Sequence, residues 1–488
     1  MAGFDVVIRG GQVATAADLF SADIGISGGR IAALGHDLAK GAEEIDARGK
    51  LVTPGGIDAH CHIDQKSSFG VPGADDFFTG TRSAACGGTT TVLSFAAQHK
   101  GMSLRQVVKD YHALATPKAV IDYGFHLIIS DPTEQVLGQE LPALIKDGYS
   151  SFKIYMTYDL LKLNDREILE VFSLARREGA FVMVHAENHD TIAWLSQKLL
   201  DAGHKAPKFH EVSRPQPVER EATHRAITFA ELVDVPILIV HVSGREAIDQ
   251  IRWAQSRGLK IFAETCPQYL FLSAEDLDQP GFEGAKCMCS PPPREKANQP
   301  YVWRGLETDV LNIISSDHAP YRYNDAQHGK LVGLKDGFKK VPNGVPGLEV
   351  RMPLLFSEGV GKGRIDIHRF VAITATTPAR LYGLAPRKGS VAVGADADLV
   401  VWDPHKQVTI TQDLLHDAMD YTPYHGMQVT GWPAVTLSRG ETVWRDGKFL
   451  GTPGRGQFLP RALSPMVKPR GQFWSGFDPN TGSYAGQP

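Results

Sequence analysis

The spacing of hydrophobic and polar residues changes twice along the chain. Near the N-terminus, short apolar runs such as Phe4–Arg9 are separated by paired glycines, a pattern that predicts β-strands over residues 1–55. The same pattern returns near the C-terminus, where Asp398–Trp402 is a further predicted strand. We expect residues 1–55 and 376–450 to build one small β domain from both ends of the chain.

The long middle part, residues 56–375, alternates helical and strand-like runs. Asp165–Glu178 carries apolar residues at helical spacing and is followed by Gly179, a residue type that commonly ends helices. Runs that follow helices, such as Phe181–Val184 and Pro236–Val240, are continuously apolar, which is typical of strands covered on both faces. This alternation predicts a (β/α) barrel, with an open doubly wound sheet as the alternative.

Residues 451–488 form a third part, rich in glycine, proline and aromatic residues and with little periodicity. Such a segment is either a disordered tail or an arm that orders against a neighbouring subunit. Phe458, Trp474 and Phe477 would expose much apolar surface in a free tail. We therefore expect a C-terminal arm up to Phe477, with a role in oligomerisation.

The composition argues against several functional classes. The net charge is −4, and the acidic and basic residues are interspersed, so no basic stripe points to nucleic acid or an anionic membrane. The N-terminus lacks the regions of a secretory signal, and no apolar run approaches the ~18 residues of a membrane helix. The five cysteines are scattered, which fits reduced thiols. We expect a cytoplasmic protein without a nucleic-acid or membrane partner.

Two histidines one residue apart, His60 and His62, mark the first candidate site. Alternate side chains of a strand point to the same face, so both imidazoles can reach one metal ion. Alone, such a pair is more often packed or at the surface, but four further polar residues sit where the apolar runs of the middle part end. The carboxyl ends of barrel strands line the active sites of such folds, so these residues together predict a hydrolase with two metal ions. They are Lys153, His185, His241 and Asp317.

Lys153 is the unusual member of this set, because an ammonium group has no lone pair for a metal ion. Its amine becomes a ligand when carbon dioxide converts it to a carbamate, whose two anionic oxygens can bridge two divalent ions. Such ions lower the pKa of bound water and polarise a carbonyl group. The alternative is a Lys153 ammonium paired with an acid, which would compete with the metals.

The order of these six residues resembles the amidohydrolase superfamily of binuclear metal barrels. More narrowly, the chain is similar to dihydropyrimidinases and D-hydantoinases over about residues 4–450. The motifs that carry this similarity are Gly87-Gly-Thr-Thr-Thr91, Phe152-Lys-Ile-Tyr-Met-Thr-Tyr158, Glu264-Thr-Cys-Pro-Gln-Tyr-Leu270, Cys289-Ser-Pro-Pro-Pro293, Ser316-Asp-His-Ala-Pro320 and Asn343-Gly-Val-Pro-Gly347.

This resemblance implies an α/β fold, a distorted (β/α)8 TIM-like barrel with a composite β-sandwich domain built from both termini. It also implies a homotetramer and two divalent metal ions. The ligand types suit several such ions, of which we expect zinc. The implied ligands are His60, His62 and Asp317 for the first ion, His185 and His241 for the second, and N6-carboxylated Lys153 as the bridge between them.

The resemblance further implies a reaction, the opening of the cyclic amide bond of a dihydropyrimidine or a 5-substituted hydantoin to give an N-carbamoyl amino acid. Asp317 would move a proton from the attacking water to the departing nitrogen. Tyr158 would hydrogen-bond the reacting carbonyl oxygen. Backbone groups of Ser290 and Asn343 would hold the ureide part of the ring.

Other functions remain as alternatives. A dihydroorotase would be expected to carry an arginine just after the two histidines, where this chain continues Ile63-Asp-Gln-Lys66, and Tyr158 argues against an allantoinase. A non-catalytic scaffold relative would have lost metal ligands, and all six positions are intact here. The segment Gln65–Gly73 departs from the commonest hydantoinase sequences, so the substrate stays open; Phe69 and Phe95 are candidates for an apolar rim around a ring substituent.

Overall fold

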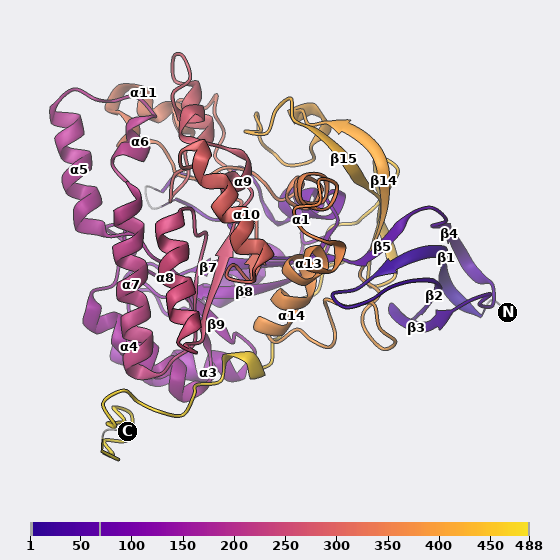
Figure 1. Cartoon of the computed structure of the whole chain (residues 1–488), viewed down its shortest axis with the longest axis horizontal. Coiled ribbons are helices and arrows are strands. Elements are labelled where there is room, and N and C mark those ends of the chain that lie inside the picture. The colour runs from indigo at the N-terminus through magenta and orange to yellow at the C-terminus, as the bar shows by residue number, and fades with distance from the viewer. Residues whose placement is uncertain (1–2, 68–69, 487–488) are drawn as a thin grey trace.

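The computed structural model describes residues 3–67 and 70–486, and a parallel barrel occupies the middle of this chain (Figure 1). Its eight strands lie side by side in chain order, from β6 to β13. The His62 N–H donates to the His318 carbonyl (2.7 Å), which brings the two outer strands together and nearly closes the barrel. The predicted fold class is confirmed. The strands are β6 (Gly56–Cys61), β7 (Thr89–Ala97), β8 (Asp122–Ile128), β9 (Ser151–Tyr155), β10 (Phe181–His185), β11 (Ile237–Ile239), β12 (Ile261–Thr265) and β13 (Ile313–Ile314).

Both faces of the barrel strands are buried, as their continuous apolar sequences predict. Alternate residues of β10 point to opposite faces, so Met183 joins the core inside the barrel while Val184 joins the layer beneath the helices. In the same way Leu238 of β11 faces inward and Ile239 faces outward. The interior of the barrel is therefore a packed core and not a channel.

Helices cover the outside of the barrel (Figure 1). Local signals define α4: the Asn164 side chain accepts the Glu167 N–H, and Gly179 ends the helix in the left-handed conformation at φ 74°. The main helices are α1 (Phe77–Cys86), α2 (Leu104–Ala115), α3 (Leu141–Lys146), α4 (Asp165–Glu178), α5 (His189–Asp201), α6 (Phe209–Val212), α7 (Gln216–Val233), α8 (Arg245–Ser256), α9 (Gln268–Phe271), α10 (Gln299–Glu307), α11 (Gly333–Asp336), α12 (Arg351–Leu355), α13 (Ile367–Val371) and α14 (Thr377–Leu381).

Strands from the two ends of the chain form a separate sheet beside the barrel (Figure 1). β5 pairs antiparallel with β14, with Leu51 opposite Trp402, and this pairing joins the N-terminal to the C-terminal strands. The sheet curls so that Ile24 and Leu437, from its two halves, share one apolar core. Its strands are β1 (Phe4–Ala14), β2 (Leu19–Ser27), β3 (Arg30–Gly35), β4 (Gly41–Asp46), β5 (Leu51–Pro54), β14 (Leu399–Thr409), β15 (Gln428–Ser438), β16 (Glu441–Arg445) and β17 (Lys448–Phe449).

A buried cluster of charges ties this sheet to the amino-terminal end of the barrel. The Lys388 ammonium lies 2.7 Å from Asp122, the first residue of β8, and within 3.0 Å of carboxylate oxygens of Asp396 and Asp398. Arg439 adds a second cation, 3.0 Å from Asp122. Because these groups are buried, each charge depends on its partners.

The C-terminal segment first follows the barrel and then leaves it. Phe458 pairs by a bridge with Tyr123 and stacks on Phe125 and Tyr149, so this part of the segment packs against its own chain. Farther on, Trp474 is 61% exposed, and the end of the chain extends away from the body (Figure 1).

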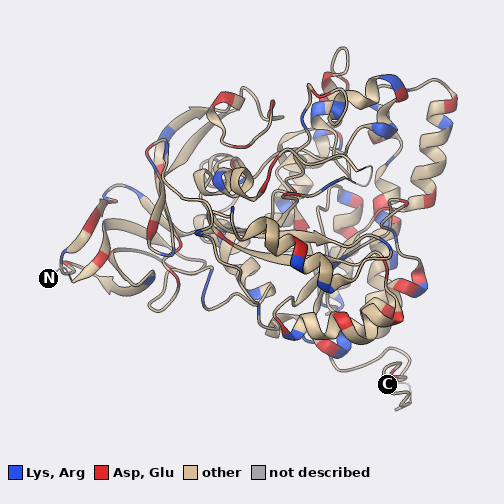
Figure 2. Ribbon diagram, turned by 180° about the vertical axis from the view of Figure 1, so that it is seen from behind, with Lys and Arg blue, Asp and Glu red and all other residues tan. Residues whose placement is uncertain are grey.

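The surface carries both signs of charge. Figure 2 shows Lys and Arg interspersed with Asp and Glu over the helices, which agrees with the mixed charge pattern of the sequence. In the part of the chain that the structure describes, no helix combines the length and the apolar character that crossing a membrane requires.

Candidate metal centre and substrate pocket

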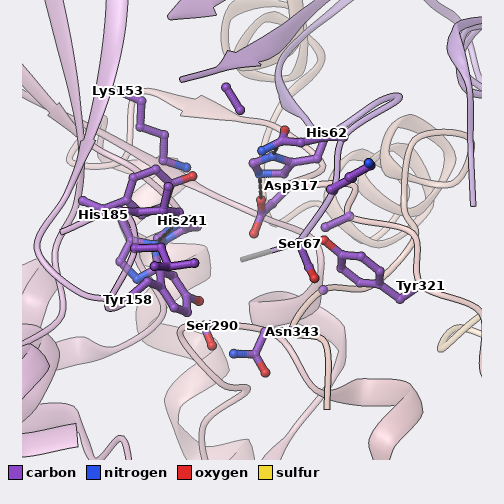
Figure 3. Close-up of a pocket in the computed structure, with 18 of the residues that line it drawn as sticks. His62, Ser67, Lys153, Tyr158, His185, His241, Ser290, Asp317, Tyr321 and Asn343 are labelled. Atoms are coloured by element: carbon purple, nitrogen blue, oxygen red, sulfur yellow. Dashed lines mark hydrogen bonds and ion pairs between the residues drawn. The ribbon is translucent and has the colours of Figure 1, made fainter. Parts of the chain in front are cut away.

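The six predicted metal ligands converge at the carboxyl end of the barrel, and all of them except His60 are labelled in Figure 3. They come from five strands that are distant in the sequence and belong to the same nearly closed sheet. His60 lies in β6 with His62 just after it, Lys153 lies in β9, His185 is the last residue of β10, His241 follows β11, and Asp317 follows β13.

His60, His62 and Asp317 form one half of this cluster. An Asp317 carboxylate oxygen lies 3.1 Å from His60 Nε2 and 3.3 Å from His62 Nε2. Lys153 Nζ approaches the same His60 Nε2 to 2.8 Å. Ligand atoms around a tetrahedral ion with bonds of about 2.0–2.2 Å lie roughly 3.4 Å apart, so these separations fit one shared cation.

His185 and His241 form the other half. His185 Nδ1 and His241 Nε2 are 2.9 Å apart, and both side chains are buried. His60, His241 and Asp317 each offer a ligand atom, and these three atoms lie within 4.8 Å of one another. The two halves therefore belong to one compact group of donors.

Three of the four histidines are oriented by a second side chain. His60 Nδ1 contacts Glu264 at 2.6 Å, and Glu264 also accepts the backbone N–H of His241. His185 Nε2 contacts Glu187 at 2.7 Å, so its Nδ1 is left for the cluster. Such partners fix the ring orientation and the tautomer of a metal-binding histidine.

Sequence reasoning missed these orienting residues. His62 Nδ1 lies 2.7 Å from Gln65 Oε1, in a segment that stood out only by its unusual sequence. Glu264 opens one of the quoted motifs, and this position was the available signal. Neither pairing follows from spacing alone.

Lys153 departs from the expected position at a strand end, because it is the third of the five residues of β9. Its long side chain covers the remaining distance, whereas the shorter histidines must start nearer the end. Lys153 is 1% exposed, and burial lowers the pKa of its amine to about 8. Within the described residues no carboxylate forms an ion pair with it; its nearest polar neighbour is His60. The alternative of a lysine paired with an acid is therefore not what the structure shows.

The backbone is strained at three of the candidate site residues. Tyr158, His241 and Asp317 have φ angles of 69°, 40° and 48°, in a region that residues with a side chain rarely adopt. Such strain persists where the surrounding structure enforces it and is concentrated at functional sites. All three side chains line the pocket at the carboxyl end of the barrel.

A pocket opens beside the metal-type ligands, and the three predicted substrate-binding residues line it (Figure 3). Tyr158 lies near His185, with ring centres 5.3 Å apart, and Ser290 and Asn343 lie beyond it. Burial raises the pKa of the Tyr158 hydroxyl, so this group stays protonated as a hydrogen-bond donor. His62, Lys153 and Asp317 line the same pocket, whereas fully buried His60 lies beneath it.

The predicted apolar rim is not supported at Phe95. Its ring is fully buried and packs against His60 and His62, with ring centres 4.9 Å away in each case, so it supports the ligands and does not face the pocket. Phe69 lies outside the described residues.

The donors fit divalent metal ions. Four imidazoles, one carboxylate and one amine without an acidic partner meet at this site, and the buried Nδ1 of His241 has no hydrogen-bond partner among the described residues. Imidazole and carboxylate are the ligands that Zn²⁺ and similar ions prefer. A parallel barrel with such a centre at its carboxyl end, next to a pocket lined by Tyr158, defines the class of metal-dependent barrel hydrolases.

Comparison with known proteins specifies this class. Residues 51–443 match the amidohydrolase family. A D-hydantoinase of Geobacillus stearothermophilus is 46% identical over 459 residues, which cover 93% of this chain and 96% of the relative. The crystal structure of a dihydropyrimidinase from Brevibacillus agri NCHU1002 has a TM-score of 0.91 at 43% identity, covering 94% of this chain and 99% of that chain. The chain belongs to the amidohydrolase family, among the D-hydantoinases and dihydropyrimidinases.

Proposed function

We propose that this protein hydrolyses the cyclic amide bond of dihydropyrimidines or 5-substituted hydantoins and releases N-carbamoyl amino acids. The observation that supports this most is that candidate metal ligands and candidate substrate-binding residues line one pocket. Candidate metal ligands form one wall, and Tyr158, Ser290 and Asn343 form the other. A planar cyclic ureide held between these walls would present its ring carbonyl to the metal side.

Two divalent ions, zinc in our proposal, would be held by His60, His62 and Asp317 and by His185 and His241. N6-carboxylated Lys153 would lie between them; its burial without an acidic partner supports this modification. When bound, such ions activate water and polarise the carbonyl under attack.

The chain's own groups account for the remaining steps. The Asp317 carboxylate lies at the floor of the pocket, where it can take a proton from the attacking water and return it to the ring nitrogen as the C–N bond breaks. This transfer is needed because an amide anion is a poor leaving group. The Tyr158 hydroxyl would donate to the carbonyl oxygen as negative charge develops there.

Backbone groups of Ser290 and Asn343 would hold the ureide, which fixes the ring for attack. The ring substituent would then lie outside these polar contacts. We also propose a cytoplasmic homotetramer, in which the segment from residue 451 takes part, acting on small molecules rather than on nucleic acid or membranes. The domain limits of 1–55 with 376–450, 56–375 and 451–488 are part of the same proposal.

The test is the ring-opening rate of metal-loaded, bicarbonate-treated protein on dihydrouracil and on a 5-substituted hydantoin, with dihydroorotate and allantoin as controls. We expect turnover of one or both of the first two. Activity confined to dihydroorotate or allantoin would keep the metal centre and overturn the substrate class. Failure on all four, in protein that contains metal, would contradict the proposal.

A further inference from the structure

We infer that Lys330 and His210, two residues behind the pocket wall, are positioning residues for substrate: they fix and polarise the two peptide groups whose N–H groups face the ureide. This inference rests on the proposed function, because that function assigns the ureide to Ser290 and Asn343. Neither Lys330 nor His210 lines the pocket that contains the candidate metal ligands. Their effect would therefore pass through the backbone.

Lys330 is buried in a way that needs a reason. Its side chain is fully buried, and within the described residues it forms no ion pair with a carboxylate. Lysines are rarely buried unless they are paired. Burial lowers the pKa of its amine to about 7, yet both the charged and the neutral amine retain at least two N–H donors.

The two acceptors of Lys330 lie in the two substrate-binding segments. Lys330 Nζ donates to the Met288 carbonyl (3.0 Å) and to the Pro342 carbonyl (3.2 Å). The Gly344 N–H donates to the same Met288 carbonyl (2.9 Å). One amine thus connects the segment before Ser290 to the segment before Asn343 and sets the distance between them.

The Pro342 carbonyl belongs to the same peptide group as the Asn343 N–H. A hydrogen bond to a peptide oxygen draws electron density toward that oxygen and makes the N–H of the same peptide a stronger donor. No hydrogen bond among the described residues uses the Asn343 backbone N–H, so it is available to a ligand. Lys330 therefore strengthens a donor that the proposed function assigns to the ureide.

His210 repeats this arrangement on the other segment. His210 Nε2 donates to the Cys289 carbonyl (2.8 Å), and this carbonyl shares its peptide group with the Ser290 N–H. The Ser290 N–H is likewise unused within the described part of the chain. Burial, with the nearby Arg214 cation, lowers the pKa of His210 to about 3, so a neutral ring donates through Nε2. Each ureide-binding amide thus has a buried donor behind its carbonyl.

The first experiment compares Lys330→Met with a matched control, Lys335→Met, which changes an exposed lysine five positions away. Losing a buried hydrogen bond from an amine should raise KM for dihydrouracil or the hydantoin about 10- to 100-fold. The value of kcat should change less than about 3-fold, because the N–H groups of Ser290 and Asn343 would bind the ground state and the transition state equally. Metal content should stay at the wild-type level, and Lys335→Met should behave as wild type.

The second experiment separates polarisation from mere packing. Dihydro-2-thiouracil, in which sulfur replaces the ureide oxygen, is a weaker acceptor, so wild type should prefer dihydrouracil by affinity. Lys330→Met should shrink this preference, and Lys330→Gln, which restores an N–H donor, should recover part of it. His210→Phe should shrink it in the same way, which keeps the test usable if Lys330→Met does not fold.

Equal loss of affinity for both ligands, or a lower melting temperature with unchanged KM, would overturn the inference. Failure of the proposed function is a different outcome: wild-type protein would then open none of the cyclic ureides. A wild type that turns over dihydrouracil, with variants that keep its KM, would reject only the role of Lys330 and His210.

Discussion

Two buried lysines at opposite ends of the barrel show how the same residue type serves different purposes. Lys153, at the carboxyl end, is buried beside His60 without an acidic partner, and its pKa is lowered to about 8. Lys388, at the amino end, is buried just as deeply but lies among three carboxylates, and burial is outweighed so that its pKa is raised. Both lysines are buried, but among the described residues only Lys388 has carboxylates as ion-pair partners.

This difference matches a division of labour in barrel folds, where the carboxyl ends of strands carry chemistry and the amino ends carry stability. A lysine without an acid remains reactive, because its neutral amine is accessible at moderate pH. A lysine locked by acids is chemically inert and holds elements together. The comparison predicts that equivalent substitutions at the two ends will have different consequences.

The largest effect is expected at the carboxyl end. Lys153→Met should reduce kcat/KM by at least about 10³-fold and release most of the bound metal, because the bridging anion is lost. Metal analysis and ring-opening assays would measure this, and added short carboxylates should restore part of the activity by replacing the carbamate. Wild-type metal content together with wild-type turnover would remove the contrast between the two lysines.

The next prediction tests whether Asp317 takes part in the reaction as a proton carrier or only supports the structure. Asp317→Asn should lower kcat by about 10²- to 10⁴-fold, because the amide cannot carry the proton to the leaving nitrogen. The exposed Asp336→Asn serves as a control. If Asp317→Asn kept its metals and near-full turnover, the assignment of Asp317 as proton carrier would be wrong.

At the amino end the expected change is in stability. Lys388→Met leaves the carboxylates of Asp122, Asp396 and Asp398 without their shared cation, and the free energy of unfolding should fall by about 3–5 kcal/mol. Lys406→Met, at an exposed position of β14, should change it by less than about 0.5 kcal/mol. Urea denaturation gives both values. Per folded molecule, kcat should be unchanged in both variants. A selective loss of kcat in Lys388→Met would refute the assignment of this end of the barrel to stability.

The smallest expected effect is the pH dependence of the difference in unfolding free energy between wild type and Lys388→Met. The folded pKa of Lys388 lies above its unfolded value, so its contribution is complete below the unfolded pKa of about 10.4 and is lost as the pH rises toward the folded pKa. The gap in unfolding free energy between wild type and Lys388→Met should be constant from pH 7 to about pH 10 and should shrink above it. A gap that shrinks already between pH 7 and 9 would contradict the charge assignment.

Local signals let the sequence predict some elements well. Asp165–Glu178 was predicted with the bounds that α4 has, because its apolar spacing and its Gly179 end are local signals; the Asn164 cap that fixes its start was not part of that prediction. Strand lengths were predicted less well: β14 continues to Thr409, well past the predicted Asp398–Trp402, because β15 pairs along it. Strand extent depends on a partner that is distant in sequence.

The candidate site divides in the same way. Ligand types such as His60 and Asp317 are legible from the sequence because only a few side chains bind metals. The contact of His60 with Glu264, and the link from Lys330 to Met288, depend on how separate loops pack and could not be read from spacing. The burial of Phe95 against the histidines has the same origin, which is why its predicted place at the rim was wrong.

The pairing of β5 with β14 has a consequence for biosynthesis. The ribosome releases Leu51 long before Trp402, its partner across the sheet, and the entire barrel is made in between. During that interval the edge of β5 lacks its mate and offers free backbone groups to other nascent chains. Completion of the sheet therefore waits until Trp402 has been made, and chains that stop short of β14 should be the species that aggregate.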